Sequence, residues 1–336
     1  MGTRDSMAYS TLSIWCNAKI PAEAKVSLRA GIGENRIIFA DETTSAAPVG
    51  ANTVAILGAL PADADIAFGQ PDPVEVMRSE RLRWVHLNSA GYTRYDRDDL
   101  RTKFYKRGAV LTNSSNVYSE PAAQHLLAMM LTLARQLPHS FENQRSGHIW
   151  SFHDIRSRAR LLNSQTVLLL GFGHIARRLS ELLAPLGMNV VVVRQRVRGD
   201  EPARVFTEAE IEDVLPSADH VVNILPSSPA TTNFLNAKRL SLMKHGAILY
   251  NIGRGTTVDQ KMVMERLQSG HLVAAYLDVT DPEPLPPEHP LWETPNCYIT
   301  PHIAGGHSNE MERLATHFLD NFRRFTQGEP LLNRVL

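Results

Sequence analysis

A glycine-rich turn shows the clearest binding chemistry in the sequence. Gly171, Gly173 and Ala176 form the pattern G-x-G-x-x-A after the apolar run 166–170, where a helical pattern begins. The first glycine permits a tight turn, the second lets a pyrophosphate approach the backbone, and the small third residue lets helix and strand pack closely. Because N–H groups at a helix N-terminus attract phosphate, we predict a dinucleotide site that includes His174 and Ile175.

Three arginines follow the next apolar strand pattern. Arg194, Arg196 and Arg198 come after four consecutive valines, and Arg194 stands 23 positions after Gly171. In NAD-binding units this place holds an acidic residue that accepts hydrogen bonds from the ribose 2′-hydroxyls. An aspartate would repel a 2′-phosphate, whereas an arginine pairs with it. The sequence therefore predicts a preference for NADP(H), with NAD(H) as the alternative, and Arg194 as the phosphate ligand, assisted by Arg196 or Arg198.

A second chemically active set lies further along the chain. Arg254, Glu283 and His302 are separated by 29 and then 19 positions, and each follows an apolar strand pattern at a loop. Ligands of open α/β sheets collect in such loops. A guanidinium binds anions, and an imidazole transfers protons near neutral pH. Each residue alone has an ordinary structural explanation, but as a spaced set after a dinucleotide motif the three predict an active site.

Two series of alternating strand and helix patterns must position these residues. The first occupies roughly the first 115 residues and the second begins at Thr166, and such alternation is typical of doubly wound parallel sheets. Between them, Ser119 is the expected cap of a long helix. Its apolar face contains Leu126, Met129, Met130 and Leu133. A last helix at about 308–327 follows both series and is free to pack on the first domain. We therefore predict an α/β protein of two lobes, the first discontinuous.

Composition limits the classes of partner. Lysine plus arginine number 35 and aspartate plus glutamate number 35, so no global field favours nucleic acid or an acidic membrane surface. No apolar run is long enough to span a bilayer. Cys16 and Cys297 are far apart and form no metal-type spacing. We expect a protein of the reducing cytoplasm with no metal site.

At the quoted segments the chain resembles the D-isomer-specific 2-hydroxyacid dehydrogenases. The resemblance runs from about Leu82 to the C-terminus and includes "LPSSPATTNFLNAKRLSLMKHGA" and "FRRFTQGEPLLN". It implies a Rossmann-type NAD(P)-binding domain at 116–302 and a flavodoxin-like substrate domain formed by 1–115 and 303–336. It also implies a homodimer built largely on the nucleotide-binding domain and its long helix.

The resemblance further implies an oxidoreductase of class EC 1.1.1.- that uses NADPH to reduce a small 2-oxo acid, such as glyoxylate or hydroxypyruvate, to the D-2-hydroxy acid. His302 is then the proton donor, since imidazole gives and retrieves a proton near neutrality. Glu283 would pair with His302, orient its ring and stabilise the imidazolium. Arg254 would bind the substrate carboxylate and polarise the carbonyl.

Other residues receive roles through the same resemblance. Asp278 would hold the nicotinamide carboxamide, and Pro226 and Gly253 would line the coenzyme site. The backbone N–H groups of Ala90 and Gly91 match the loop that binds the substrate carboxylate in the family.

Two alternative functions stay open at this point. One is a dinucleotide-sensing binding protein of the same fold, like the carboxy-terminal-binding corepressors. The other is an NAD-dependent dehydrogenase of the formate or phosphite type. Where the family commonly has "GVDNID", this chain has "GYTRYD" at 91–96. The identity of the 2-oxo acid therefore cannot be carried over from the family.

Overall fold

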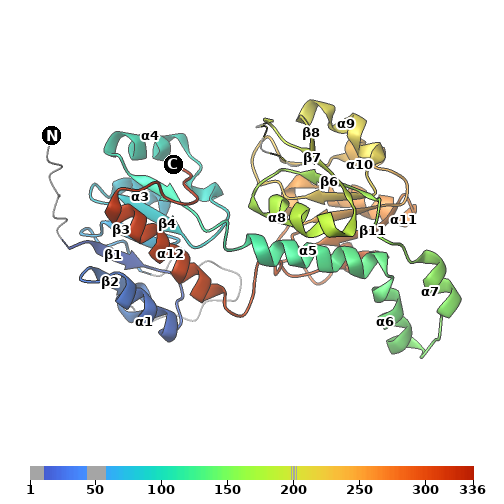
Figure 1. Ribbon diagram of the computed structural model, residues 1–336, viewed down its shortest axis with the longest axis horizontal. Helices are drawn as coiled ribbons and strands as arrows, with labels where there is room; N and C mark the ends of the chain where they lie inside the picture. Colours follow the sequence, from blue (N-terminus) through green and yellow to red (C-terminus); the bar gives the residue numbers. More distant parts are fainter. Residues whose placement is uncertain (1–10, 44–57, 198, 200, 202) are drawn as a thin grey trace. The chain divides into compact units, whose positions relative to one another are not determined.

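A computed structural model describes residues 11–43, 58–197, 199, 201 and 203–336 (Figure 1). The chain forms two compact α/β units, each built on an all-parallel sheet. Unit 1 contains the residues up to Val117 together with His307–Leu336, and unit 2 is Tyr118–Gly306. The predicted α/β class and the discontinuous first lobe are both confirmed.

The described residues of unit 1 form a five-stranded sheet of order β2-β1-β3-β4-β5, which is the flavodoxin-like arrangement. The strands are β1 (Ser13–Cys16), β2 (Arg36–Phe39), β3 (Ile66–Gly69), β4 (Trp84–Leu87) and β5 (Val110–Thr112). The α-helices are α1 (Ala22–Gly31), α2 (Ala40–Thr43), α3 (Pro73–Arg78), α4 (Asp98–Arg107) and α12 (Glu310–Gln327), with a 3-10 turn at Thr93–Tyr95. All five strands fall in the short apolar runs of the first predicted series.

The C-terminal helix α12 completes the core of unit 1, where Figure 1 shows it beside α1. Phe318 is fully buried, and its ring stacks on Phe68 at a centroid separation of 4.5 Å and on Trp84 at 5.3 Å. Phe322, four positions later, lies in the same apolar cluster, as helical periodicity requires. The predicted return of the last helix to the first lobe is therefore confirmed.

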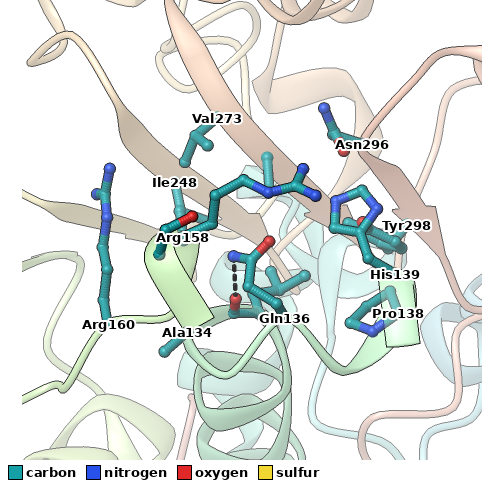
Figure 2. Close-up of a pocket in the computed structure, with 13 residues that line it drawn as sticks. Ala134, Gln136, Pro138, His139, Arg158, Arg160, Ile248, Val273, Asn296 and Tyr298 are labelled. Carbon is teal, nitrogen blue, oxygen red and sulfur yellow. Dashed lines mark hydrogen bonds between the residues drawn. The ribbon is translucent and has the colours of Figure 1, made fainter. Parts of the chain in front are cut away.

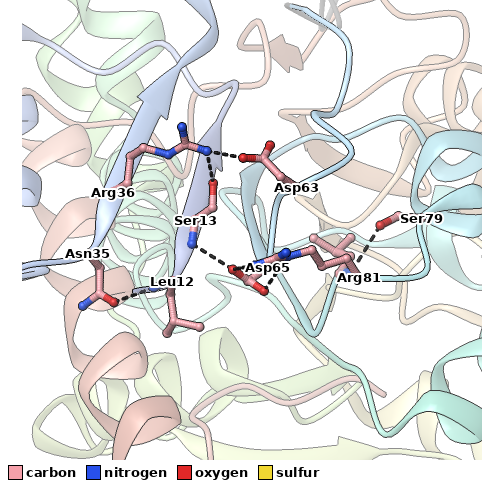
Figure 3. A network of polar contacts seen from close by, with 9 residues as sticks. Leu12, Ser13, Asn35, Arg36, Asp63, Asp65, Ser79 and Arg81 are labelled. Carbon is pink, nitrogen blue, oxygen red and sulfur yellow. Dashed lines mark hydrogen bonds and ion pairs between the residues drawn. The ribbon is translucent and has the colours of Figure 1, made fainter. Parts of the chain in front are cut away.

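A polar network ties together the strands of unit 1 at their amino ends (Figure 3). The buried carboxylate of Asp65 accepts hydrogen bonds from the Ser13 backbone N–H at 2.9 Å and from Arg81 Nε at 3.0 Å. Arg36 donates to the Ser13 hydroxyl at 3.0 Å. Because Ser13 begins β1, Arg36 begins β2 and Asp65 precedes β3, the network fixes three adjacent strands while it compensates a buried charge.

The described residues of unit 2 form a seven-stranded sheet of order β12-β11-β10-β9-β6-β7-β8. The strands are β6 (Thr166–Leu170), β7 (Asn189–Val193), β8 (Arg204–Phe206), β9 (His220–Asn223), β10 (Ala247–Asn251), β11 (Leu272–Leu277) and β12 (Cys297–Ile299). The strand order reverses at β6, as in Rossmann-type sheets. Among the described strands of unit 2, only β8 lacks an apolar run that predicts a strand, because it is a three-residue edge strand with no buried position.

Helices cover both faces of the unit 2 sheet. The α-helices are α5 (Ser119–Ala134), α6 (Leu137–Ser146), α7 (Phe152–Arg158), α8 (His174–Leu183), α9 (Ile211–Val214), α10 (Ala237–Leu242) and α11 (Gln260–Gln268). Short 3-10 turns lie at Ala184–Leu186, Glu208–Glu210, Leu215–Ser217, Gly255–Thr257 and Pro290–Glu293. One apolar cluster joins α5 and α8 to the sheet, and a second joins α9, α10 and α11 to it.

Helix α5 begins at the predicted residue but without the predicted cap. Tyr118 occupies the N-cap position, and its backbone is already in the right-handed helical region, so Ser119 falls inside the first turn. The expected capping role of Ser119 is therefore wrong. Its predicted apolar face is largely buried, with Leu126, Met130 and Leu133 in the core. Among the described residues, no helix is long and apolar enough to cross a membrane.

His220 makes the stability of unit 2 depend on pH. Its side chain is buried at the start of β9, with Nδ1 3.1 Å from the Tyr250 hydroxyl and Nε2 2.5 Å from Gln165 Oε1. Burial lowers the pKa of His220 from its ordinary 6.5 to about 4. Between these two pKa values the unfolded chain binds a proton at His220 and the folded chain does not. The free energy of unfolding therefore falls as pH falls from 6.5 to 4, by up to about 3 kcal/mol.

We expect the substitution His220→Gln to make the free energy of unfolding less dependent on pH between pH 6.5 and 4, because glutamine does not titrate. Urea unfolding at several pH values measures this slope. His245→Gln, which removes an exposed histidine, is the control and should leave the slope close to that of the unchanged protein. An equal slope in the His220 variant would contradict the assignment.

Candidate active site

The candidate residues of unit 2 gather at one edge of its sheet, where the strands end. Gly171 follows β6, Arg194 follows β7, Pro226 follows β9, Gly253 and Arg254 follow β10, Asp278 follows β11, and His302 follows β12. Parallel pairing places all of these carboxyl ends at the same edge. The strand order reverses at β6, which is where sheets of this kind bind ligands.

The glycine turn leaves room for a ligand at the N-terminus of α8. Gly171 has φ 91°, which favours glycine, and its N–H donates to the Val193 carbonyl at 2.8 Å. A Cβ added to Gly173 would meet no described heavy atom within 4 Å, so packing inside the protein does not require glycine there. Ala176 is fully buried where α8 crosses the sheet. These features fit a pyrophosphate bound near the backbone N–H groups at the start of α8, where His174 and Ile175 lie.

Arg194 has an acidic partner that sequence reasoning missed. Its Nη1 forms an ion pair with Glu201 Oε1, and the other carboxylate oxygen of Glu201 accepts a hydrogen bond from the Gly199 N–H at 2.9 Å. The side chains of Arg194 and Glu201 are 12% and 1% exposed. Arg196 lies on the exposed loop after β7, and Arg198 lies outside the described residues. The positive charge of Arg194 is therefore paired with a buried carboxylate.

The loops after β9 and β10 touch closely. A Cβ on Gly253 would lie 2.6 Å from the carbonyl oxygen of Leu225, so only glycine fits at this position. Pro226, the next residue of the facing loop, is exposed, and its carbonyl accepts a hydrogen bond from the Thr231 hydroxyl at 2.6 Å. The two loops thus hold each other in place beside the glycine turn.

Arg254 carries a largely buried positive charge. Burial lowers the pKa of its guanidinium below the ordinary value, while the nearby negative charge of Glu283 raises it. Arginine remains charged throughout the range in which proteins fold. Nη1 donates to the Gly253 carbonyl at 2.6 Å, which turns the side chain back onto its own loop. A cation held in a partly dry site acts strongly on an anion that approaches it.

Buried asparagines at two strand ends fix the Arg254 loop, and sequence reasoning missed them. Asn251 Nδ2 donates to the Arg254 carbonyl at 3.1 Å, as does the Thr257 hydroxyl at 2.6 Å. Asn223 Nδ2 donates to Asn251 Oδ1 at 3.0 Å and to Thr257 Oγ1 at 2.6 Å. The sequence signal that could have revealed them is the asparagine that ends each of two otherwise apolar strands.

His302 and Glu283 are in direct contact. His302 Nδ1 pairs with Glu283 Oε1, and the side chains are 47% and 41% exposed. Among the described residues His302 Nε2 makes no hydrogen bond, so it is the ring nitrogen left available to a ligand. His302 also has φ 54°, a left-handed conformation that non-glycine residues adopt at a cost. The structure therefore brings Arg254, Glu283 and His302 to one place.

Asp278 organises the loop that carries His302. Its carboxylate is 3% exposed and accepts hydrogen bonds from the N–H groups of Ile303 at 2.9 Å and Ala304 at 3.0 Å, and from the Thr300 hydroxyl at 2.6 Å. Its main-chain carbonyl accepts from the His302 N–H at 2.8 Å. Asp278 is thus bound to almost every residue around His302.

Ala90 and Gly91 belong to unit 1, in the loop after β4. The Ala90 carbonyl accepts a hydrogen bond from Asn113 Nδ2 at 2.8 Å, and the Gly91 carbonyl accepts one from the Ser89 hydroxyl at 2.7 Å. In the described part of the chain their N–H groups make no such bond. Successive backbone N–H groups without a partner in the protein are suited to an anion.

A separate cavity lies at the opposite edge of the unit 2 sheet. It has a volume of about 330 Å³ and opens at the amino ends of β10, β11 and β12, near Ile248, Val273 and Asn296 (Figure 2). Arg158 and His139 project over it. It contains none of the candidate residues, and the described residues contain no group of His, Cys, Asp and Glu able to hold a metal ion.

Comparisons with known proteins agree with the geometry. Residues 127–304 match the family described as D-isomer specific 2-hydroxyacid dehydrogenase, NAD binding domain. A glyoxylate reductase of Aeropyrum pernix is 31% identical and covers 77% of each chain. A human glyoxylate reductase/hydroxypyruvate reductase is 29% identical, over 74% of this chain and 76% of the human one. The crystal structure of a D-isomer specific 2-hydroxyacid dehydrogenase from Xanthobacter autotrophicus Py2, in complex with NADPH and MES, has TM-score 0.79, 26% identity and coverage of 97% and 98%.

Proposed function

Because the chain belongs to the D-isomer specific 2-hydroxyacid dehydrogenase family, an NAD(P)-dependent oxidoreductase family of class EC 1.1.1.-, we propose that it uses NADPH to reduce a small 2-oxo acid to the D-2-hydroxy acid. Glyoxylate and hydroxypyruvate define the substrate class, in line with the names of the relatives above. The observation that carries the proposal is the His302–Glu283 pair beside Arg254, at the same sheet edge as the glycine turn.

Each residue of this set has a task in the reduction. Bound NADPH supplies the hydride that reaches the carbonyl carbon. Arg254 binds the substrate carboxylate and neutralises the charge that develops on the carbonyl oxygen. His302 then gives that oxygen a proton from Nε2, while Glu283 at Nδ1 orients the ring. The carbonyl gains one hydride and one proton, which gives the hydroxyl of the product.

Unit 2 is the proposed coenzyme domain. The N-terminus of α8, together with Gly171 and Gly173, would hold the pyrophosphate, and Arg194 would pair with the 2′-phosphate. A phosphate must then share Arg194 with Glu201 or displace it. Arg196, exposed on the same loop, offers a second cation. We therefore propose that NADP(H) is preferred and that Glu201 weakens the preference.

Unit 1 is the proposed substrate domain. The open N–H groups of Ala90 and Gly91 suit a carboxylate, which supports their predicted role. Asp278, Pro226 and Gly253 lie at the same carboxyl edge of the unit 2 sheet as the glycine turn, which supports their predicted coenzyme contacts. The domain limits at 115 and 303 and these contacts stay predictions.

We also propose that the protein forms a homodimer through an arm of unit 2, defined here as residues 137–161. Its helices α6 and α7 extend away from the sheet (Figure 1). The arm exposes several large apolar side chains, and Trp150 is 91% exposed. These side chains are Leu137, Phe141, Ile149, Trp150, Phe152 and Leu161. A concentration of such residues in one segment marks an association surface.

The reaction is tested by adding NADPH and a panel of 2-oxo acids and following coenzyme absorbance. We expect turnover with at least one small member. His302→Ala should lower kcat by about 10²–10⁴-fold, the usual contribution of a general acid, while coenzyme binding is retained. His245→Ala, which changes an exposed histidine at the amino end of β10, is the control. A protein that binds NADPH but turns over no panel member would favour a dinucleotide sensor.

Coenzyme preference is tested by titrating NADPH and NADH. Arg194→Ala should weaken NADPH binding by about 1.5–3 kcal/mol, the range for hydrogen bonds to charged groups, and leave NADH binding nearly unchanged. Glu201→Gln should strengthen NADPH binding, because it removes the competing charge.

The double variant Arg194→Ala, Glu201→Gln controls for the unpaired carboxylate that the single arginine variant leaves behind. It should still bind NADPH more weakly than the unchanged protein. A wild-type preference for NADH, or equal NADPH affinity in the arginine variants, would refute the role of Arg194.

The dimer is tested by sedimentation. Trp150→Ser should shift the protein toward monomer at low micromolar concentration, since it removes the most exposed aromatic side chain of the arm. Val26→Ser, which changes an exposed apolar residue of unit 1, is the control and should sediment like the unchanged protein. A monomeric wild type at high concentration would contradict the proposal.

A further inference from the structure

A chain of hydrogen bonds runs from helix α5 to the loop that carries His302. His125 Nε2, on α5, lies 2.5 Å from the Tyr276 hydroxyl on β11. The Tyr276 hydroxyl lies 2.6 Å from Thr300 Oγ1, and Thr300 donates to Asp278 Oδ1 at 2.6 Å. Four side chains from three segments of unit 2 are thereby linked.

The chemistry of the groups fixes the direction of these bonds. A carboxylate only accepts, so the single proton of the Thr300 hydroxyl goes to Asp278. Burial raises the pKa of Tyr276 above its ordinary value, so the phenol keeps its one proton. The Tyr276 hydroxyl then donates to Thr300 at 2.6 Å, lies 3.4 Å from Asp278 Oδ1, and accepts from His125 Nε2–H. Every proton in the series points toward Asp278, and each bond polarises the next.

The end of the series is the backbone around His302. Asp278 holds the N–H groups of Ile303 and Ala304 and, through its own carbonyl, that of His302. His302 has the left-handed φ of 54°, which costs energy and persists only where neighbouring contacts impose it. The position of the imidazole therefore depends on the orientation of one carboxylate.

We propose that Tyr276 and His125 are positioning residues, which act through Thr300 and Asp278 to hold the His302 loop in its reactive conformation. The inference rests on the proposed function, because it assigns His302 the proton transfer. Neither residue needs to touch substrate or coenzyme. They affect the position of His302, the proposed proton donor.

Tyr250 offers a matched control on the neighbouring strand β10. It is fully buried, and its hydroxyl also meets one histidine, His220, at 3.1 Å. That histidine bonds to Gln165 before β6, and among the described residues it makes no hydrogen bond to the His302 loop. Removing either phenol oxygen thus deprives one histidine of its contact with a tyrosine hydroxyl, but only Tyr276→Phe breaks the series to Asp278.

The kinetic test compares these two variants. Tyr276→Phe should lower kcat by about 10- to 100-fold, the range that misplacement of a reacting group produces, with the KM for NADPH nearly unchanged. Tyr250→Phe should leave kcat close to wild type. Thr300→Val should resemble Tyr276→Phe, and Thr300→Ser should restore most of the lost kcat. Because the groups act in series, His125→Asn added to Tyr276→Phe should cause little further loss.

Hydrogen exchange gives a readout that does not need activity. The amides of Ile303 and Ala304 should exchange faster in Tyr276→Phe than in the unchanged protein, and should not change in Tyr250→Phe. Equal exchange, or equal kcat in the two tyrosine variants, would overturn the inference. A wild-type protein without turnover on any 2-oxo acid would instead overturn the proposed function, and the exchange comparison would still decide whether Tyr276 holds the loop.

Discussion

Parallel pairing in the unit 2 sheet is the constraint on which the candidate site depends. All strands end at the same edge of the sheet, so residues that are far apart in the sequence come together there. Gly171 and His302 are brought to this edge by β6 and β12, which lie at different positions in the same sheet. The loops at the edge are then locked by buried polar groups, because a loop that carries backbone N–H and carbonyl groups next to an apolar sheet must satisfy them.

The sequence predicted the parts of the site that local pattern encodes. The glycine turn and the strand ends could be predicted, since each depends on a run of residues within one element. The return of α12 to unit 1 could be predicted because this helix follows both series of strand and helix patterns. The partners that act across elements could not. Glu201 lies in an irregular segment with no periodicity to place it against Arg194. Asn223 and Asn251 look like interruptions of apolar strands until the register of the sheet pairs them. Tyr276 looks like another interruption until the fold brings its hydroxyl to His125 of α5.

The Arg194–Glu201 pair also changes what the arginine means electrostatically. A lone arginine at the end of β7 would give this corner a net positive charge, and attraction to a 2′-phosphate would be large. With the buried carboxylate present, the pair is neutral, and a phosphate gains only the difference between its own bonds to Arg194 and those of Glu201. Specificity for the phosphate is then a difference between two interactions and not a single attraction.

The residues of the proposed catalytic set differ in burial. Arg254 is largely buried, so its charge is weakly screened toward an anion that approaches it. His302 and Glu283 are each nearly half exposed, and an ion pair in such surroundings contributes little energy and holds geometry weakly. The precision that proton transfer needs must therefore come from the backbone side of His302. Asp278, 3% exposed and bonded to the residues on either side, supplies it, which is why the hydrogen bonds behind this carboxylate matter for the reaction.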